Sequence, residues 1–408
     1  MAPTDRASRT TAATALPRVT ILTADAGFGH RSAAKAVAEA LHNRYGDRVE
    51  ASITNPLDSK LAPLLLRESQ TDYDRWVNQV PELYRLGYEA SSTLIPTRMM
   101  EDALAVLLFE AIKEAYSTYK PDVVLTTYPL YQAAIALLYR TRKIHIPVFT
   151  VVTDLATVHR LWFHKKMDGC LVPTRIVAEM AVSNQVPAAK VCITGIPVYP
   201  DISLETHSRE EICAVLDWQA GITTILAVGS RRSNRLLEML NVVNHYGAPL
   251  QLAVVAGKNE ELHRQLKQVD WHIPVHIYDF VDRMPALMKS SDLVISKAGG
   301  LIVTESLACG LPMILTEINP GQETGNAEYV KAAQAGVTVN TTVDLLEALH
   351  HFLADDGAML ARYTENARAI GKPDSAFKVA DILWQAAHGR AGCRKNGVIP
   401  NPQEGSSS

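Results

Sequence analysis

Two successive series of short β-branched segments, each alternating with helical segments, constrain the fold of this chain more than any other feature. The predicted strands are residues 19–23, 49–53, 123–127, 148–152, 170–172 and 191–194, then 223–228, 252–256, 275–278, 293–295, 313–315 and 337–339. Such segments lack strict polar–apolar alternation, which is typical of parallel sheets covered by helices on both faces. We therefore predict an α/β protein with two doubly wound domains facing across a cleft.

The length of 408 residues also favours two domains, because one hydrophobic core rarely grows beyond about 250–300 residues. In chain order we predict a disordered tail at 1–17, a first domain at 18–197 with a helical insertion at about 59–120, a second domain at 201–372, a terminal helix at 373–388 and a disordered tail at 389–408. In two doubly wound domains, ligands are expected at the carboxyl ends of the strands.

Composition argues against several classes of protein. The formal net charge of -3 gives no reason to expect nucleic acid as a partner. No apolar run reaches the roughly 18 residues that suggest a membrane-spanning helix. The five cysteines are scattered without a CxxC pair, so neither a disulfide framework nor a zinc site is indicated, and a reducing cytoplasm is the expected compartment.

A glycine-rich turn follows the first predicted strand and ends at His30, before a predicted helix at 31–43. Gly29 would let another molecule approach the backbone, and the start of the helix offers unpaired N–H groups. Positive potential there disfavours imidazolium, so a neutral His30 could act as a general base on an alcohol. A histidine that merely caps the helix is the alternative. Ser32 stands where a dinucleotide fingerprint needs its third glycine, which argues against a nicotinamide enzyme.

A second loop, Ser296-Lys297-Ala298-Gly299-Gly300, opens another predicted helix. A glycine loop at a helix start suits a diphosphate. We assign Glu305, within that helix, to two ribose hydroxyls, because an ionised carboxylate accepts through both of its oxygens. A solvated helix charge is the alternative for Glu305.

The segment Pro320-Gly321-Gln322-Glu323-Thr324-Gly325-Asn326 follows the next strand and starts a further helix. Gln322 and Asn326 are four residues apart and would share one helix face, where amide groups suit recognition of sugar hydroxyls. We include Glu323 in the same substrate-binding set, and simple N-capping is the alternative. Phe280, after another strand, could hold a base or be an ordinary core residue.

In the first domain, the strand ending at Thr153-Asp154 leads to His159 and then to Trp162, Phe163, Lys165 and Lys166. Aromatic rings beside lysines suit a lipid interface, and ordinary packing of Trp162 is the alternative. We count Asp154 and His159 as substrate-binding residues. His159 lacks a convincing set of partner ligands for a metal. Asp72-Tyr73-Asp74 spells a DxD motif but lies in the helical insertion, so no essential metal and no cofactor are expected.

Taken in order, these motifs resemble the family of monogalactosyldiacylglycerol synthases and processive diacylglycerol glucosyltransferases, which have the GT-B fold. The resemblance covers the chain from about residue 19 to 370. Its most specific segments are VVTDLATVHRLWFHKKMDGCLVPT at 151–174, KAGGLIVTESLACGLPMIL at 297–315 and PGQETGN at 320–326.

The resemblance implies an inverting, metal-independent transfer of a hexose from a UDP-sugar to 1,2-diacylglycerol. It implies that His30 is the base, that Glu305 binds the ribose and that Gln322 and Asn326 bind the sugar. The WFHK and PGQETGN sequences resemble the galactolipid enzymes more than the glucosyl ones, which favours galactose over glucose. Relatives often carry a glycine run where this chain has Gly229-Ser230-Arg231-Arg232, so Arg231 could supply charge to the diphosphate instead.

The implied partners are a UDP-hexose, diacylglycerol and a membrane surface with anionic lipids. The resemblance implies a peripheral association with the cytoplasmic face of the membrane. We assign this surface to the insertion together with Trp162, Phe163, Lys165 and Lys166. Three alternatives stay open: another lipid or sterol acceptor, a nicotinamide oxidoreductase, and a UDP-sugar-binding protein without catalytic activity.

Overall fold

The computed structural model describes residues 16–26, 28–64, 66–68, 94–230, 235–281, 284–319 and 322–390. These residues form two six-stranded parallel sheets with the orders β2-β1-β3-β4-β5-β6 and β12-β11-β10-β7-β8-β9. The strands are β1 Arg18–Leu22, β2 Glu50–Thr54, β3 Val123–Thr126, β4 Val148–Val151, β5 Gly169–Val172, β6 Val191–Ile193, β7 Thr223–Val228, β8 Leu250–Val255, β9 Val275–Tyr278, β10 Leu293–Lys297, β11 Met313–Thr316 and β12 Gly336–Thr338. The predicted doubly wound architecture is confirmed.

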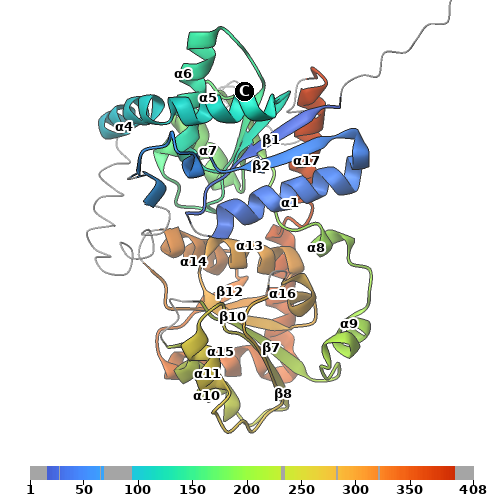
Figure 1. Ribbon diagram of the computed structural model, residues 1–408. Coiled ribbons are helices and arrows are strands. Elements are labelled where there is room, and N and C mark those ends of the chain that lie inside the picture. Colours follow the sequence, from blue (N-terminus) through green and yellow to red (C-terminus); the bar gives the residue numbers. More distant parts are fainter. Residues whose placement is uncertain are drawn as a thin grey trace, which may run out of the picture.

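Helices cover both faces of each sheet, and the two domains lie one above the other in Figure 1. They are α1 Phe28–Tyr45, α4 Leu94–Leu107, α5 Phe109–Tyr119, α6 Gln132–Arg142, α7 Arg175–Ser183, α8 Asp201–Leu204, α9 Arg209–Leu216, α10 Leu236–Asn244, α11 Glu260–Leu266, α12 Pro285–Lys289, α13 Gly300–Cys309, α14 Gln322–Ala332, α15 Thr342–Leu353, α16 Ala358–Ile370 and α17 Ser375–Ala387. The near-continuous apolar strands require this two-sided cover.

The last helix returns to the first domain. In α17, Phe377, Val379 and Leu383 are buried in the same core as the inner face of α1, and the Tyr45 hydroxyl donates to Asp381 across that contact at 2.7 Å. The chain therefore passes twice between the domains, and Ser375 Oγ accepts from Val198 N at 3.2 Å where the two passages meet. Figure 1 shows α17 rising beside α1.

Several predictions concern segments that lie wholly or partly outside the described residues. The two tails, residues 69–93 of the insertion and Asp72-Tyr73-Asp74 lie wholly or largely outside the described residues, whereas α4 and α5 fall within the predicted insertion. Among the helices that the structure describes, none is long and apolar enough to cross a membrane. Cys170, Cys213 and Cys309 are free thiols.

Candidate active site

His30 lies in the first turn of α1, immediately beyond the carboxyl end of β1. The helix starts at Phe28, three residues earlier than the predicted start at Arg31, so Gly29 and His30 are helical rather than part of the loop. A Cβ placed on Gly29 would meet no atom within 4 Å. The backbone beside His30 is therefore open to an approaching molecule, as the glycine predicted.

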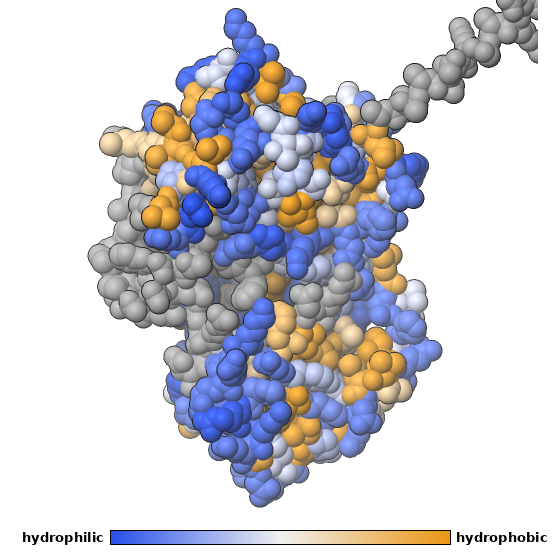
Figure 2. Space-filling view, in the orientation of Figure 1, coloured by the Kyte–Doolittle hydropathy of each residue, from blue (hydrophilic) through white to orange (hydrophobic). Residues whose placement is uncertain are grey.

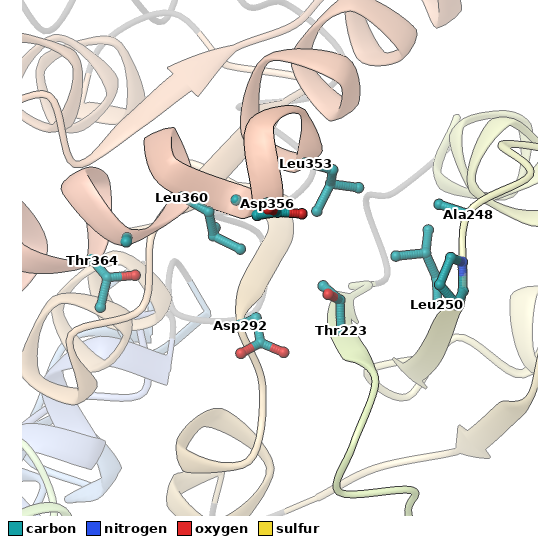
Figure 3. A pocket seen from close by; sticks show the side chains of 11 residues that line it. Thr223, Ala248, Leu250, Asp292, Leu353, Asp356, Leu360 and Thr364 are labelled. Atoms are coloured by element: carbon teal, nitrogen blue, oxygen red, sulfur yellow. The ribbon is translucent and has the colours of Figure 1, made fainter.

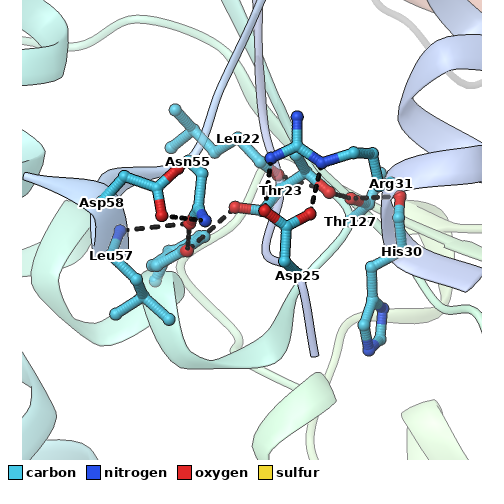
Figure 4. A network of polar contacts seen from close by, with 10 residues as sticks. Leu22, Thr23, Asp25, His30, Arg31, Asn55, Leu57, Asp58 and Thr127 are labelled. Atoms are coloured by element: carbon cyan, nitrogen blue, oxygen red, sulfur yellow. Dashed lines mark hydrogen bonds and ion pairs between the residues drawn. The ribbon is translucent and has the colours of Figure 1, made fainter. Parts of the chain in front are cut away.

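Two threonines at the ends of neighbouring strands hold His30. Thr127, just after β3, places its hydroxyl oxygen 3.1 Å from the His30 carbonyl oxygen and 3.0 Å from Thr23 Oγ1. Thr153, just after β4, places Oγ1 3.0 Å from His30 Nδ1. Figure 4 shows the first of these contacts within a larger polar network that includes Asn55 and the Asp25–Arg31 ion pair. Sequence reasoning named neither threonine as a site residue, although Thr127 ends one predicted strand and Thr153 directly follows another.

The surroundings of the His30 ring favour its neutral form. Burial lowers the pKa of His30 to about 4, and a backbone hydrogen bond to Thr127 opposes this shift. The ring packs edge-on against Tyr128, with centroids 5.1 Å apart, and lies 5.9 Å from the ring of Trp162. At neutral pH the imidazole is uncharged and has one nitrogen able to accept a proton.

The amino end of α13 has no side-chain cap. Gly299 is the N-cap residue and makes no side-chain capping bond, and the helix ends at Gly310 in the left-handed conformation with φ 70°. The first N–H groups of a helix have no partner within the helix, and they carry the positive end of its dipole. The predicted diphosphate loop is thus an uncapped helix start, and its helix α13 lies against α1 (Figure 1).

Glu305 lies one turn further along α13 and is buried, with 4% of its surface exposed. Burial raises the pKa of its carboxyl group to about 8. Within the described residues, no lysine or arginine forms an ion pair with it. The carboxyl group is therefore protonated at neutral pH, unlike the solvated helix charge that was the alternative.

The start of α14 combines capping with binding to the neighbouring loop. Glu323 accepts from Asn319 N at 2.8 Å, which is a capping contact. Asn326 is buried, and its Nδ2 donates to the Ala298 carbonyl oxygen at 2.9 Å. The side chain of Gln322 is outside the described residues. The amide of Asn326 therefore fixes the Gly299-Gly300 loop, while sugar contacts by Gln322, Glu323 and Asn326 stay predictions.

Phe280 follows β9 and has 42% of its surface exposed, so the core-residue alternative is wrong. Lys258 Nζ lies 4.1 Å from the centre of its ring. An exposed ring at the carboxyl end of a strand is free to stack on a planar base. Arg231, the other predicted contact to the donor, lies outside the described residues.

The loop after β4 joins the two domains at the site. Leu155 is buried in the core of the second domain. A Cβ on Gly325 would lie 2.2 Å from Thr157 Oγ1, and one on Gly300 would lie 3.4 Å from the Thr153 carbonyl oxygen. The amino ends of α13 and α14 therefore pack against the loop after β4, and Thr153 of this loop also contacts His30.

The same loop corrects our prediction of a lipid-facing aromatic pair. Trp162 and Phe163 are buried in a core with β5 and α7, with 2% and 5% of their surfaces exposed. Their predicted membrane role is wrong, because η4 (Arg160–Trp162) turns the rings inward and Trp162 Nε1 donates to Asp154 Oδ2 at 3.0 Å. Lys165 and Lys166 are exposed.

Asp154 and His159 are themselves buried within this loop. Asp154 accepts from Trp162 Nε1, and His159 Nδ1 accepts from Leu161 N at 3.2 Å as the N-cap of η4. Burial lowers the pKa of His159. These contacts stabilise the loop, and binding of substrate by either residue stays a prediction. In the described part of the chain no group of three or more His, Cys, Asp or Glu side chains could hold a metal ion.

A cavity of about 590 Å³ lies at the opposite edge of the second sheet, between the amino ends of β7 and β8 and helices α15 and α16 (Figure 3). Asp292, which lines it, is already paired with Arg209 and accepts from Thr224 N at 2.8 Å. This cavity is remote from the strand ends that carry His30 and Glu305, so it does not belong to the site.

The fold and site define a class of protein. Solved structures with the same two-domain fold include MurG of Acinetobacter baumannii, with a TM-score of 0.58 and 17% identity over 91% of this chain and 99% of that one. A UDP-GlcNAc 2-epimerase of Neisseria meningitidis bound to UDP-GlcNAc has a TM-score of 0.57 and 16% identity over 91% of this chain and 100% of that one. The chain has the GT-B fold.

Sequence comparisons identify the family. The model of monogalactosyldiacylglycerol (MGDG) synthase matches residues 30–198, and that of the glycosyltransferase family 28 C-terminal domain matches residues 224–382. The chain is 27% identical over 384 residues to a probable monogalactosyldiacylglycerol synthase of Glycine max, covering 92% of this chain and 72% of the relative. It is 28% identical over 376 residues to the Spinacia oleracea synthase, covering 90% and 72%. The chain belongs to the MGDG synthase family of glycosyltransferases.

Proposed function

We propose that this protein transfers galactose from UDP-galactose to the free hydroxyl of 1,2-diacylglycerol, with inversion at the anomeric carbon. The observation that carries this proposal is the pairing of a neutral, anchored His30 with an uncapped helix start across the domain contact. Curated relatives that cover most of the chain are monogalactosyldiacylglycerol synthases, which supports galactose and diacylglycerol as substrates.

The second domain supplies the donor site. The diphosphate would bind the N–H groups at the start of α13, where the helix dipole favours negative charge. Glu305 would accept from ribose hydroxyls, and Phe280 offers an exposed ring for the uracil. Arg231, close in sequence to the end of β7, would add positive charge if it reaches the diphosphate.

The first domain supplies the base. His30 would take the proton from the diacylglycerol hydroxyl as its oxygen attacks the anomeric carbon. The bond from that carbon to the UDP oxygen breaks, and UDP leaves with the electron pair. An α-linked donor thus gives a β-linked product. Preorganised N–H groups at helix starts stabilise the charge that develops on the leaving diphosphate, so that we expect no essential metal.

A lipid acceptor requires a surface that reaches the membrane, and we assign it to the outer side of α4. Met99 and Val106 are seven residues apart on this helix, with 70% and 71% of their surfaces exposed, and Leu61 and Leu64 are also exposed. η4 contacts α4 and leads to exposed Lys165 and Lys166, which could meet anionic headgroups. Figure 2 shows apolar patches among polar surface at the upper left, where Figure 1 places α4.

The proposal is tested by incubating the full chain with radiolabelled UDP-galactose or UDP-glucose and diacylglycerol in mixed micelles. Chromatography and mass spectrometry of the lipid product identify the sugar and acceptor. We expect galactosyldiacylglycerol, formed faster than the glucosyl lipid. Glucosyl transfer alone would overturn the choice of sugar, transfer to a sterol but not to diacylglycerol would overturn the acceptor, and UDP binding without product would favour a non-catalytic protein.

A further inference from the structure

Thr153 contacts both halves of the site. Its side-chain hydroxyl lies 3.0 Å from His30 Nδ1, and its carbonyl oxygen is the nearest atom to the position that a Cβ on Gly300 would take. Thr153 is buried and lies two residues after the end of β4, in the loop that enters the second-domain core at Leu155. One residue thereby touches the base and the donor helix.

The ring of His30 needs an orienting partner to act as a base. Tyr128 and Trp162 contact the ring, and Trp162 is itself fixed by Asp154. Such ring contacts restrict the plane of the imidazole but do not select which nitrogen carries the proton. Among the described residues no carboxylate lies within ion-pair distance of His30. The task that a carboxylate performs for many catalytic histidines therefore falls to a hydroxyl.

We propose that Thr153 is the positioning residue of the base, which rests on the proposed function of His30. The Thr153 hydroxyl accepts from the Nδ1–H group, so the lone pair is on Nε2, where an acceptor hydroxyl can give up its proton. Because the carbonyl of the same residue abuts Gly300, the position of the donor helix and the orientation of the base are linked.

The tautomer can be read without any substrate. We would label the histidines with ¹⁵N, assign the His30 resonances by their loss in His30→Asn, and compare wild type with Thr153→Ser and Thr153→Val. Wild type and Thr153→Ser are expected to carry the proton on Nδ1, and Thr153→Val, which keeps the shape but not the hydroxyl, a mixture of tautomers. A wild-type His30 with its proton on Nε2 would overturn the proposal, and apart from the His30→Asn assignment that measurement depends on no variant.

Steady-state kinetics give a second test of the role of Thr153. Since general base catalysis contributes about 10²–10⁴-fold, partial misplacement in Thr153→Val should lower kcat by about 10- to 100-fold with KM for the UDP-sugar nearly unchanged, and Thr153→Ser should restore most of it. Equal kcat in Thr153→Val and wild type would overturn the proposal. If Thr153→Val changes the tautomer but His30→Ala keeps full turnover, positioning stands and the proposed base fails.

The link to the donor helix has a matched pair of variants. A Cβ on Gly300 would lie 3.4 Å from the Thr153 carbonyl oxygen, which is an ordinary van der Waals contact, so alanine would fit there and a larger side chain is needed to displace Thr153. We expect the His30 ¹⁵N resonances to shift in Gly300→Leu and not in Gly299→Leu, because the atom nearest to a Cβ on Gly299 is Ile302 Cγ2 of the same helix, at 3.7 Å. Equal effects of the two substitutions, or none in either, would overturn the link.

Discussion

His30 and Glu305 occupy comparable places, each in a helix that begins at the carboxyl end of a parallel strand, yet burial acts on them in opposite ways. Burial keeps His30 neutral, which is the form a base requires, and two threonines already hold it. Burial also keeps Glu305 neutral, but a carboxyl group acts as an acceptor through both of its oxygens only when it is ionised, and no cation pairs with it among the described residues. In the proposed function, the base is therefore ready before the substrate arrives, whereas the donor site is completed by its ligand.

His30→Ala should have the largest effect. We expect kcat to fall by about 10²–10⁴-fold, the usual contribution of a general base, while the affinity for UDP stays within about threefold of wild type, because His30 lies in the other domain. Turnover is measured with the lipid assay and binding by calorimetry. Near-normal turnover of His30→Ala would show that His30 is not the base.

Glu305→Gln should separate binding from stability. We expect UDP affinity to fall by about 10- to 100-fold, since a hydrogen bond to a charged group contributes about 1.5–3 kcal/mol. UDP binding to wild type at pH 7 should also release about one proton, because the neutral carboxyl group must ionise. Calorimetry in buffers of different ionisation enthalpy measures this release, and its persistence in Glu305→Gln would refute the assignment.

The same variant should change how stability depends on pH. The pKa of Glu305 is about 8 in the folded protein and 4.5 ordinarily, so the folded state holds a proton that the unfolded state has lost between these values. This contribution to stability is fully present below pH 4.5 and is lost as pH rises through 8. Denaturant melts should show Glu305→Gln equal to wild type near pH 4.5 and more stable by roughly 4–5 kcal/mol at pH 9. Parallel curves would contradict burial of an uncompensated carboxyl group.

The membrane surface gives a smaller effect that again compares the domains. Replacing Met99 and Val106 by serine should weaken binding to vesicles with anionic lipid by about tenfold or more, because each buried apolar side chain contributes about 1.5–3 kcal/mol. Val215→Ser is the control, since Val215 is even more exposed than Met99 and Val106 but lies in the second domain. Flotation measures both, and equal loss in the control would remove α4 from the membrane surface.

The smallest expected effect is that of acid on the base. Because the pKa of His30 is about 4 instead of 6.5, His30 stays unprotonated as pH falls from 8 to 5. Its contribution to stability is present above pH 6.5 and lost as pH falls towards 4. We expect kcat/KM to change by less than about threefold over pH 5–8 from this group, measured where circular dichroism shows the fold intact. An acid limb centred near pH 6.5 would indicate a solvated histidine.

Much of this arrangement was predictable from sequence. The twelve strands of the described residues follow from β-branched segments, and glycines marked a helix start near His30 and another at Gly300, because only backbone geometry and chain order are needed there. Orientation was not predictable. Trp162 and Phe163 beside two lysines fit a lipid surface or a core equally well, and a short turn with one hydrogen bond to Asp154 decides for the core. A single threonine such as Thr153 gives no signal until the fold brings it to His30.

We propose that His30 activates the acceptor hydroxyl for a single direct displacement at the anomeric carbon. The most direct measurement is the anomeric configuration of the first lipid product from an α-linked UDP-hexose, read from its ¹H coupling constant by NMR. The expected result is a β-linked glycolipid from wild type and almost none from His30→Ala. An α-linked product would contradict a single direct displacement, and a β-linked product formed at the same rate by both proteins would contradict the role of His30 as base.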